Sequence, residues 1–498
     1  MASHSHIKPL AEPAPEEFRR KSRGAFVVTA AAGVIGIGAA VVLGFLEHQS
    51  HHDYFRRFFF SYLTAFAYFL AIGIGAMAFV LVQYLARAGW SVQVRRIAEN
   101  LMMTVPVMGL LALPLLYTVL SQKGDLYVWA LPDDQSLAHH DDAEPPKAVE
   151  QAKSKDAPQS SAAKDAGAHK GEAASAGGHE AGEHHSQTHR PFKLDELTYM
   201  KRPWLNPWFF TIRIVFYFAV WTAIAVYYRR HSVAQDADGN IEHTELMQKW
   251  SGISIVVLLL TMTFAVFDLF MSLDPHWFST MFGVYYAAGA FLTFFATMII
   301  LVALSRRWGA LRGVTKDHFH DLGKFQFGFT FFWGYVAFSQ FMLLWYANLP
   351  ETTPWFSRRG ATTAFPTEAQ VVAAGGSYEK ALNQVIPDFG ASWRPVAIVL
   401  LVGHLLIPFA GLLSRHVKRK LGTALFWAVW ALAFHYVNMY WIVMPEMRTG
   451  FHPALIDLAC FVGILGIFAA TWLKVSASAR LVPAQDPRLP ESVAFTNI

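Results

Sequence analysis

Ten long apolar runs constrain the fold of this chain more than any other feature of its sequence. A helix needs about 20 mostly apolar residues to cross a hydrocarbon core of about 30 Å. The sequence therefore predicts an all-α integral membrane protein. The ten predicted transmembrane helices are residues 24–46, 55–85, 97–120, 205–228, 250–272, 279–304, 322–348, 394–413, 421–443 and 453–474.

The polar segments between these helices differ in character. Residues 132–190 are rich in Ala, Lys, Glu, Gly, Ser and His and contain no aromatic residue, so they cannot bury enough apolar surface to fold. We interpret them as a disordered low-complexity loop, with metal capture by the histidines as the alternative. The rest of the predicted organisation is an N-terminal segment 1–23, transmembrane segments 24–131, 191–348 and 394–474, a second loop 349–393 and a tail 475–498.

Lysine and arginine are distributed unevenly between the two sides of the predicted helices. With the N-terminus inside, and with charges at the ends of the helices included, the cytoplasmic side carries 23 of these residues and the short outer loops carry seven. Short cytoplasmic loops of membrane proteins carry an excess of Lys and Arg. We therefore predict that both termini are cytoplasmic and that loops 132–190 and 349–393 are periplasmic. The formal net charge of +5 follows from this bias and gives no reason to expect a nucleic-acid partner.

The sequence contains a single cysteine, Cys460, inside the last apolar run. One cysteine cannot hold an iron–sulfur cluster, and the C-x-x-C-H motif of covalently attached haem is absent from the sequence. We therefore expect no redox centre carried by the chain itself.

Proline marks the start of several predicted helices. Proline is favoured at the first helical position, and Asn or Asp just before it caps the free N–H groups. We therefore expect Asp274 to cap the sixth helix. The four X-Pro pairs at predicted outer ends are Asn206-Pro207, Asp274-Pro275, Arg394-Pro395 and His452-Pro453.

Ionisable residues inside the predicted spans form the candidate site. Counted from the X-Pro residues Asp274, Asn206 and His452, the side chains of Asp268, Arg213 and Asp457 lie about 8–10 Å in from the outer side. His404 and His435 lie about 14–15 Å in from Pro395 and Pro445, near the midplane. Intramembrane charges are costly, face the bundle interior and usually pair. We interpret the five residues as candidates for a proton path or a polar site open to the outside. The alternatives are a purely structural Arg213–Asp268 pair and histidines that are satisfied core residues.

Three aromatic-rich stretches carry a resemblance: ENLMMTVPVMGLLALPLLY, SLDPHWFSTMFGVYY and GKFQFGFTFFWGYVAFSQFMLLWYANLPETTPWF. In this order they resemble the ActF-type subunits of alternative complex III, paralogues of the NrfD and polysulfide-reductase membrane-anchor family. The resemblance covers all ten predicted spans, with 132–190 as an insertion. It implies two four-helix bundles, spans 2–5 and 6–9, flanked by spans 1 and 10.

The resemblance also implies a function. It suggests a subunit of a quinol:cytochrome c or quinol:oxidase oxidoreductase in the bacterial inner membrane, with an NrfD-like paralogue, an iron–sulfur protein and c-type cytochromes as partners. The better-supported quinol site of such complexes lies in the NrfD-like subunit. ActF-type chains are linked to quinone binding and proton conduction, which we carry only onto Asp268, Arg213, Asp457, His404 and His435. No covalent cofactor is expected, and a quinone such as menaquinone is the ligand to test.

Two other functions remain as alternatives. One is a purely structural membrane anchor of the same complex. The other is a secondary transporter, because Pro106, Pro114 and Pro408 interrupt predicted helices as the broken helices of transporters do. We expect the isolated chain to be colourless, with a b-type haem between His404 and His435 as the alternative.

Overall fold

The computed structural model describes residues 16–51, 55–123, 125–131, 196–349, 352–361, 372 and 388–496. Every regular element in these ranges is a helix, and ten helical segments are long and apolar enough to cross a membrane. The predicted all-α membrane fold is therefore confirmed. Loop 132–190 and most of loop 349–393 lie outside the described residues.

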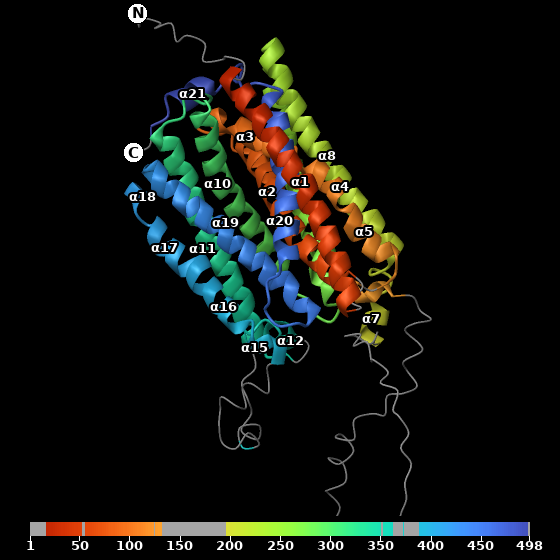
Figure 1. The fold of residues 1–498 in the computed structure, drawn as a ribbon. Coiled ribbons are helices and arrows are strands. Elements are labelled where there is room, and N and C mark those ends of the chain that lie inside the picture. Colours follow the sequence, from red (N-terminus) through yellow and green to blue (C-terminus); the bar gives the residue numbers. More distant parts are fainter. Residues whose placement is uncertain are drawn as a thin grey trace, which may run out of the picture.

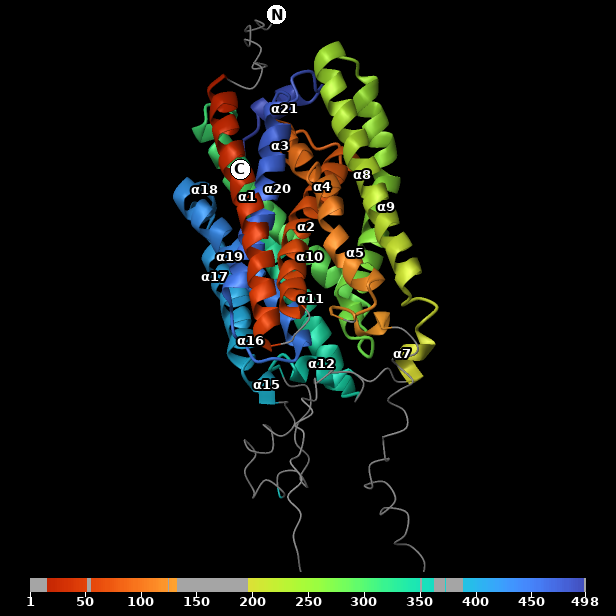
Figure 2. The same ribbon diagram turned by 45° about the vertical axis from the view of Figure 1, so that its right-hand side comes forward.

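The transmembrane segments lie side by side, as Figures 1 and 2 show. We call the end that carries α3 and α21 the terminal end, and the opposite end, with α7, α12 and α15, the distal end. The long elements are α1 (Glu16–His51), α2 (Arg56–Leu85), α3 (Val92–Met102), α4 (Val105–Leu111), α5 (Leu113–Leu120), α8 (Pro207–Asp238), α9 (Glu242–Leu269), α10 (Met281–Arg307), α11 (Lys316–Ala347), α16 (Arg394–Leu400), α17 (Ile407–Leu412), α19 (Leu421–Val443) and α20 (Leu455–Ala477). The short elements are η1 (Val128–Ala130), α7 (Glu196–Met200), η3 (Met271–Leu273), α12 (Thr353–Ser357), α15 (Asp388–Ala391), η4 (Leu401–Leu406), α18 (Arg415–Arg419), η5 (Met444–Met447) and α21 (Leu489–Val493).

The helices pack as two bundles and one flanking pair. α2, α3–α5, α8 and α9 contact one another in the first bundle, and α10, α11, α16–α17 and α19 do so in the second. α1 packs along α20. The most apolar window of α2 is 94% buried, against 17% for α1, so α2 is central and α1 lies at the edge. α2 also contacts α10, which joins the two bundles.

Glycines allow the α1–α20 pair to pack closely. A Cβ atom at Gly36 would lie 2.5 Å from the backbone N of Gly463, and one at Gly466 would lie 2.3 Å from the N of Gly33. Small residues let two membrane helices approach backbone to backbone. Gly36 is one of four small residues, Ala32, Gly36, Ala40 and Gly44, that recur every four residues in the first apolar run, and it faces α20 of the same chain.

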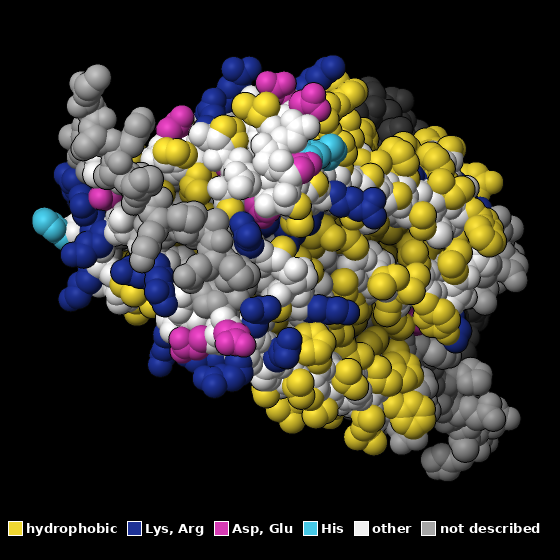
Figure 3. Space-filling model, turned by 90° about the horizontal axis from the view of Figure 1, so that it is seen from above, with side chains coloured by type: hydrophobic (Ala, Val, Ile, Leu, Met, Phe, Trp, Pro, Cys, Tyr) yellow, Lys and Arg dark blue, Asp and Glu magenta, His cyan; other side chains and the backbone are white. Residues whose placement is uncertain are grey.

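Charged and apolar side chains separate on the surface. Figure 3 shows the terminal end, where Lys and Arg side chains gather, while hydrophobic side chains cover the flank that is visible beside them. An apolar flank of this kind suits contact with lipid.

The helix starts differ from expectation at one important position. Asn206 caps α8 as predicted, because its Oδ1 accepts hydrogen bonds from the N–H groups of Trp208 and Phe209, both at 3.1 Å. The prediction for Asp274 is wrong, since α10 begins only at Met281. Asp274 instead lies in the preceding loop, where it pairs with Arg358, which directly follows α12 at the distal end.

Two predicted interruptions are present. The third transmembrane segment breaks into α3, α4 and α5, with Pro106 in the first turn of α4 and Pro114 in the first turn of α5. Before Pro408 the eighth segment widens into η4, a π-helical turn that contains His404. Proline lacks an N–H and its ring clashes with the carbonyl four residues back, which accounts for the change of helical register there.

Candidate functional site

The structure brings Arg213 and Asp268 together as an ion pair between α8 and α9. Arg213 donates from Nε to Oδ2 at 2.9 Å and from Nη2 to Oδ1 at 2.8 Å. The same carboxylate accepts from the Tyr217 hydroxyl at 2.9 Å and from Trp204 Nε1 at 3.1 Å. The Arg213 guanidinium also lies 4.2 Å from the centre of the Trp204 ring. Asp268 is fully buried with four donors, so this arrangement favours the structural interpretation of the pair.

Asp457 belongs to a different cluster. Its carboxylate accepts from Arg57 Nη2 at 3.0 Å, from the Ser61 hydroxyl at 2.5 Å, from the Tyr440 hydroxyl at 2.9 Å and from the N–H of Ala454 at 2.8 Å. None of these partners contacts Asp268. α20 begins at Leu455, so Asp457 lies in the first helical turn, and we find two separate ion pairs in place of one layer.

His404 and His435 form the buried centre of the second bundle. His404 Nε2 lies 3.2 Å from His435 Nδ1, and both side chains are almost wholly buried. The ring of His404 stacks on Trp333, with centroids 4.0 Å apart and planes 12° apart. One hydrogen bond therefore connects η4 to α19, as their predicted depths suggested.

A second hydrogen-bonded pair continues this cluster. Asn438 lies one helical turn from His435 on α19, and its Oδ1 accepts from the Tyr285 hydroxyl. Three buried atoms here have no hydrogen-bond partner among the described residues: Trp333 Nε1, His435 Nε2 and Asn438 Nδ2. Buried polar groups are normally paired with protein or with ordered water, so these atoms mark places for water or a moving proton. We call Tyr285, Trp333, His404, His435 and Asn438 the midplane cluster.

The midplane cluster does not fit a haem. A metal–imidazole bond measures about 2.0 Å, so two histidines on opposite sides of a haem iron hold their nitrogens about 4 Å apart. The facing nitrogens of His404 and His435 are 3.2 Å apart, and Trp333 covers one face of His404. Within the described ranges, no three His, Cys, Asp or Glu side chains gather as a metal site.

A charged cluster covers the distal end of the second bundle. Arg359 Nη2 lies 2.7 Å from Glu446 Oε1, and Arg358 pairs with both Asp274 and Glu446. Burial alone would raise the pKa of Asp274, but hydrogen bonds from His276 and the charge of Arg358 hold that pKa well below its ordinary value. Glu446 Oε2 has no partner among the described residues.

A pocket adjoins this distal cluster. Its volume is about 570 Å³, and Asp274 and His276 line it together with Lys201 and aromatic residues of α9 and of the neighbouring loops. His276 Nδ1 lies 3.5 Å from Asp274 Oδ1, and the His276 side chain is 31% exposed, so the ring can meet a molecule in the pocket. The aromatic lining residues are Trp204, Phe264, Phe267, Trp277 and Phe278. We call this site the distal pocket.

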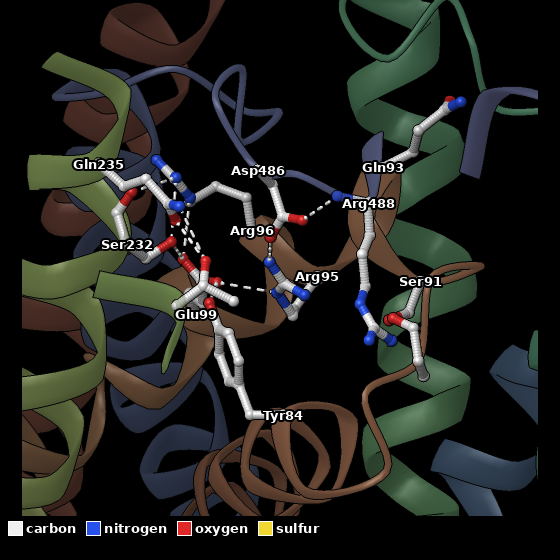
Figure 4. Close-up of polar contacts among 12 residues, drawn as sticks. Tyr84, Ser91, Gln93, Arg95, Arg96, Glu99, Ser232, Gln235, Asp486 and Arg488 are labelled. Carbon is white, nitrogen blue, oxygen red and sulfur yellow. Dashed lines mark hydrogen bonds and ion pairs between the residues drawn. The ribbon is translucent and has the colours of Figure 1, made fainter. Parts of the chain in front are cut away.

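The terminal end holds a separate ion-pair cluster, drawn in Figure 4. Glu99 is fully buried and pairs with Arg96 Nε at 2.8 Å and Arg95 Nε at 3.3 Å, while Ser232 donates to it at 2.6 Å. Asp486 from the C-terminal tail pairs with Arg95, as Figure 4 shows. Both carboxylate oxygens of Glu99 therefore have partners. Because Asp486 belongs to the tail and Arg95 to α3, this cluster joins the tail to the first bundle.

Sequence analysis therefore found the two ion pairs' acids and both histidines but missed several of their partners. Arg57 and Arg359 were counted only among the seven Lys and Arg residues of the short outer loops, and Glu446 and Asn438 were not singled out. Position on α19 could have found Asn438, because it lies three residues after His435 and so on the same helical face. Glu446 lies beyond the end of α19, in η5, where α-helical spacing no longer applies.

Comparison with known proteins gives no family for this chain: no protein-family model matches it, and no curated protein matches it. Its function is therefore argued from the residue geometry and the motif resemblance.

Proposed function

We propose that the chain is an integral membrane subunit of a quinol-oxidising respiratory complex in the bacterial inner membrane, and that it forms or flanks a quinol site and conducts protons. The observation that carries this proposal is a line of polar side chains from the distal pocket to the midplane cluster. His276 and Asp274 line the pocket, Arg358 joins Asp274 to Glu446, and α19 leads from Glu446 inward.

The distal pocket suits the head of a quinol. Aromatic walls stack on a flat ring, and polar groups at one side fix its hydroxyls. His276 accepts a proton from a quinol hydroxyl, and Asp274 at 3.5 Å stabilises the imidazolium that forms. Trp277 Nε1, a buried donor without a partner among the described residues, also belongs to the pocket lining.

The α19 face continues the proton path. Asn438 lies about 12 Å along the helix from Glu446, and His435 lies about 4.5 Å beyond Asn438. A proton path across these gaps needs water at the unpartnered atoms of Glu446, Asn438 and His435. Between His404 and His435 a single hydrogen bond suffices for proton transfer, because imidazole both accepts and donates.

Quinol oxidation must balance two electrons and two protons. Oxidation of one quinol to quinone releases two electrons and two protons. The electrons need an acceptor outside this chain, because its one cysteine cannot hold an iron–sulfur cluster. We assign the electrons to iron–sulfur and cytochrome subunits of the complex. The residues of this chain then act only on the quinol protons and on the orientation of the ring.

A structural anchor is the second candidate function, and a specific observation favours it. The Arg213–Asp268 and Arg57–Asp457 pairs satisfy their carboxylates completely, as groups that hold helices together do. If this function is the only one, the midplane histidines can be replaced without loss of proton transfer.

The test is replacement of each midplane histidine in the intact complex, reconstituted in liposomes. His404→Gln and His435→Gln keep polarity but cannot carry a proton at neutral pH. We expect assembled complex with a lower proton yield per quinol oxidised. His416→Gln is the matched control, because His416 is exposed in α18. Unchanged turnover and proton yield in both midplane variants would refute proton conduction.

A further inference from the structure

A second cavity lies between α19 and α20, away from the distal pocket. Its volume is about 550 Å³, residues of α2 and α10 complete its walls, and we call it the lateral groove. Val429 of α19 and Leu465 of α20 line it and are exposed, so the groove opens toward the lipid. A hydrophobic molecule in the membrane can therefore enter the groove without crossing water.

The lateral groove is closed at the level of the midplane. There α19 and α20 approach each other, because the rings of Tyr436 and Phe461 have centroids 4.6 Å apart and the Tyr440 hydroxyl donates to Asp457 at 2.9 Å. The ring of Tyr68 on α2 packs against Tyr436 and Phe461, with centroids 5.5 and 5.9 Å away. Toward the terminal end α19 slants away from α20, as Figure 1 shows. The groove therefore widens toward the terminal end and stops at the midplane.

The length of the groove matches one half of a bilayer. Counted from the terminal ends of their helices, Leu301 and Trp472 lie about 7–9 Å in, and Tyr436 and Phe461 lie about 22–24 Å in. The groove therefore extends over about 15 Å, which is half of a hydrocarbon core of about 30 Å. The acyl chain of a lipid covers the same distance, from the level of its head group to the midplane.

The lining of the groove selects against a polar ligand. Apart from Thr297 its side chains are aliphatic or aromatic, and none of them is charged. A polar group placed against such walls loses its hydrogen bonds to water without gaining new ones, which costs free energy. Burial of methylene groups is favourable instead. The walls therefore favour a plain hydrocarbon chain over a ligand that carries oxygen atoms along its buried part.

Positive charge lies at the terminal ends of the helices that form the groove. Arg306 and Arg307 end α10, Lys474 lies in the last turn of α20, and Lys420 directly precedes α19. All four side chains are exposed. Figure 3 shows the Lys and Arg side chains that gather at this end. An anionic head group above the groove would therefore meet opposite charge from three helices.

We infer that the lateral groove holds one acyl chain of an anionic phospholipid from the leaflet on the terminal side, with the lipid phosphate among the cations that end α10, α19 and α20. The chain fills the space where α19 and α20 diverge, and so it supports the packing of α20 against the second bundle. This site goes beyond the proposed function, because the groove and the distal pocket share no lining residue.

The first experiment counts the phospholipids that stay bound after a detergent wash, by native mass spectrometry of the full chain in the assembled form in which it is purified. Ala433→Trp fills the groove, because Ala433 is exposed on α19 and lines it. Ala223→Trp is the matched control, because Ala223 is exposed on α8 and does not line the groove. We expect one phospholipid fewer in Ala433→Trp alone. An unchanged number of phospholipids, or the loss of a quinone in their place, would overturn the inference.

A second measurement keeps the test decisive if the tryptophan disturbs folding. Phosphatidylglycerol, which is anionic, should raise the thermal stability of the delipidated protein more than phosphatidylethanolamine, which has no net charge. Arg307→Gln combined with Lys474→Gln leaves the walls of the groove intact. We expect this double variant to bind phosphatidylglycerol about tenfold more weakly, since each surface cation adds to the attraction of an anionic lipid.

Arg230→Gln combined with Lys249→Gln is the control for the charge variant. Both residues are exposed near the terminal end, on α8 and α9, which do not form the groove. We expect this control to keep the preference of the wild type for phosphatidylglycerol. Equal stabilisation of the wild type by the two lipids, or an equal loss of affinity in both double variants, would refute an anionic lipid in the groove.

Discussion

Arg213 and Asp268 form a bidentate ion pair inside the membrane, with both Asp268 oxygens bound by the same guanidinium at 2.8 and 2.9 Å. The pair ties α8 to the last turn of α9. Trp204 and Tyr217 donate to the same carboxylate, so no acceptor is left for a transferred proton without breaking a bond. Asp268 differs in this respect from His404 and His435, because not every buried nitrogen of these two rings has a hydrogen-bond partner among the described residues.

Loss of the Asp268 charge should therefore lower the amount of assembled complex. Asp268→Asn leaves Arg213 buried without a counter-charge, which typically costs about 3–5 kcal/mol. Complex abundance in membranes, measured by blue-native electrophoresis, checks this expectation.

Removal of both charges is the control for that variant. Replacing Arg213 and Asp268 together by leucine removes the unpaired charge, and a well-packed apolar pair is often as stable as a buried ion pair. We expect abundance to recover largely, with normal turnover in the complex that assembles. Full abundance of Asp268→Asn combined with uncoupled turnover would instead identify Asp268 as a proton carrier.

We expect low pH to destabilise the distal end, because the Asp274 carboxylate takes up a proton there. Arg358 and His276 hold the folded pKa of this carboxyl below the ordinary value of about 3.9. Its stabilisation is therefore present above about pH 4 and is lost as the pH falls toward the lower folded pKa. At pH 7 we expect Asp274→Asn to lower the stability of the complex by about 1.5–3 kcal/mol, the worth of a charged hydrogen bond.

The measurement is thermal unfolding of wild type and Asp274→Asn between pH 3 and pH 7. The gap between their midpoints should begin to narrow below about pH 4, because the Asp274 carboxyl of the unfolded chain then takes up a proton while that of the folded chain, with its lower pKa, stays charged. A gap that stays constant across this range would exclude the Arg358–Asp274 pair as its origin.

The predicted orientation is tested by labelling. Because Lys and Arg favour one side by 23 to seven, we expect both termini in the cytoplasm. A single cysteine introduced into residues 132–190 should react with a membrane-impermeant maleimide once the outer membrane alone is permeable. Reaction only after the inner membrane is opened would reverse the orientation. A cysteine in the tail should show the opposite behaviour.

Most of the helical architecture could be predicted because hydrophobic length is a local property. Each of the ten apolar runs coincides with a transmembrane segment. The ends were less predictable, since they depend on residues distant in sequence. Asp274 has the local signature of a helix cap, yet Arg358, more than 80 residues later, pairs with it, and α10 begins only at Met281. A single sequence does not show that Arg358 competes with the helix N-terminus for the Asp274 carboxylate.

The candidate site was predictable to the extent that its members lie on adjacent helices at matching depth. This reasoning placed Arg213 beside Asp268 and His404 beside His435. It failed for Asp457, whose partner Arg57 begins a helix that is distant in sequence. Depth counted from a proline gives height in the membrane but not the direction in which a side chain faces the bundle.

The close approach of Gly289 to His435 gives a sharp prediction for proton transfer. A Cβ atom at Gly289 would lie 2.3 Å from Cε1 of His435, which is too close for any real side chain. Gly289→Ala must therefore displace the imidazole and lengthen its 3.2 Å contact with His404, at a cost of about 1–3 kcal/mol for the overpacked core. We expect the complex to assemble, with a proton yield per quinol as low as in His435→Gln.

Gly38→Ala is the matched control, because a Cβ atom at Gly38 meets nothing within 4 Å. Proton release in reconstituted liposomes, followed with an external pH dye during quinol oxidation, compares the two variants. A normal yield in Gly289→Ala, with the ring shown to have moved, would mean that protons do not pass between His404 and His435.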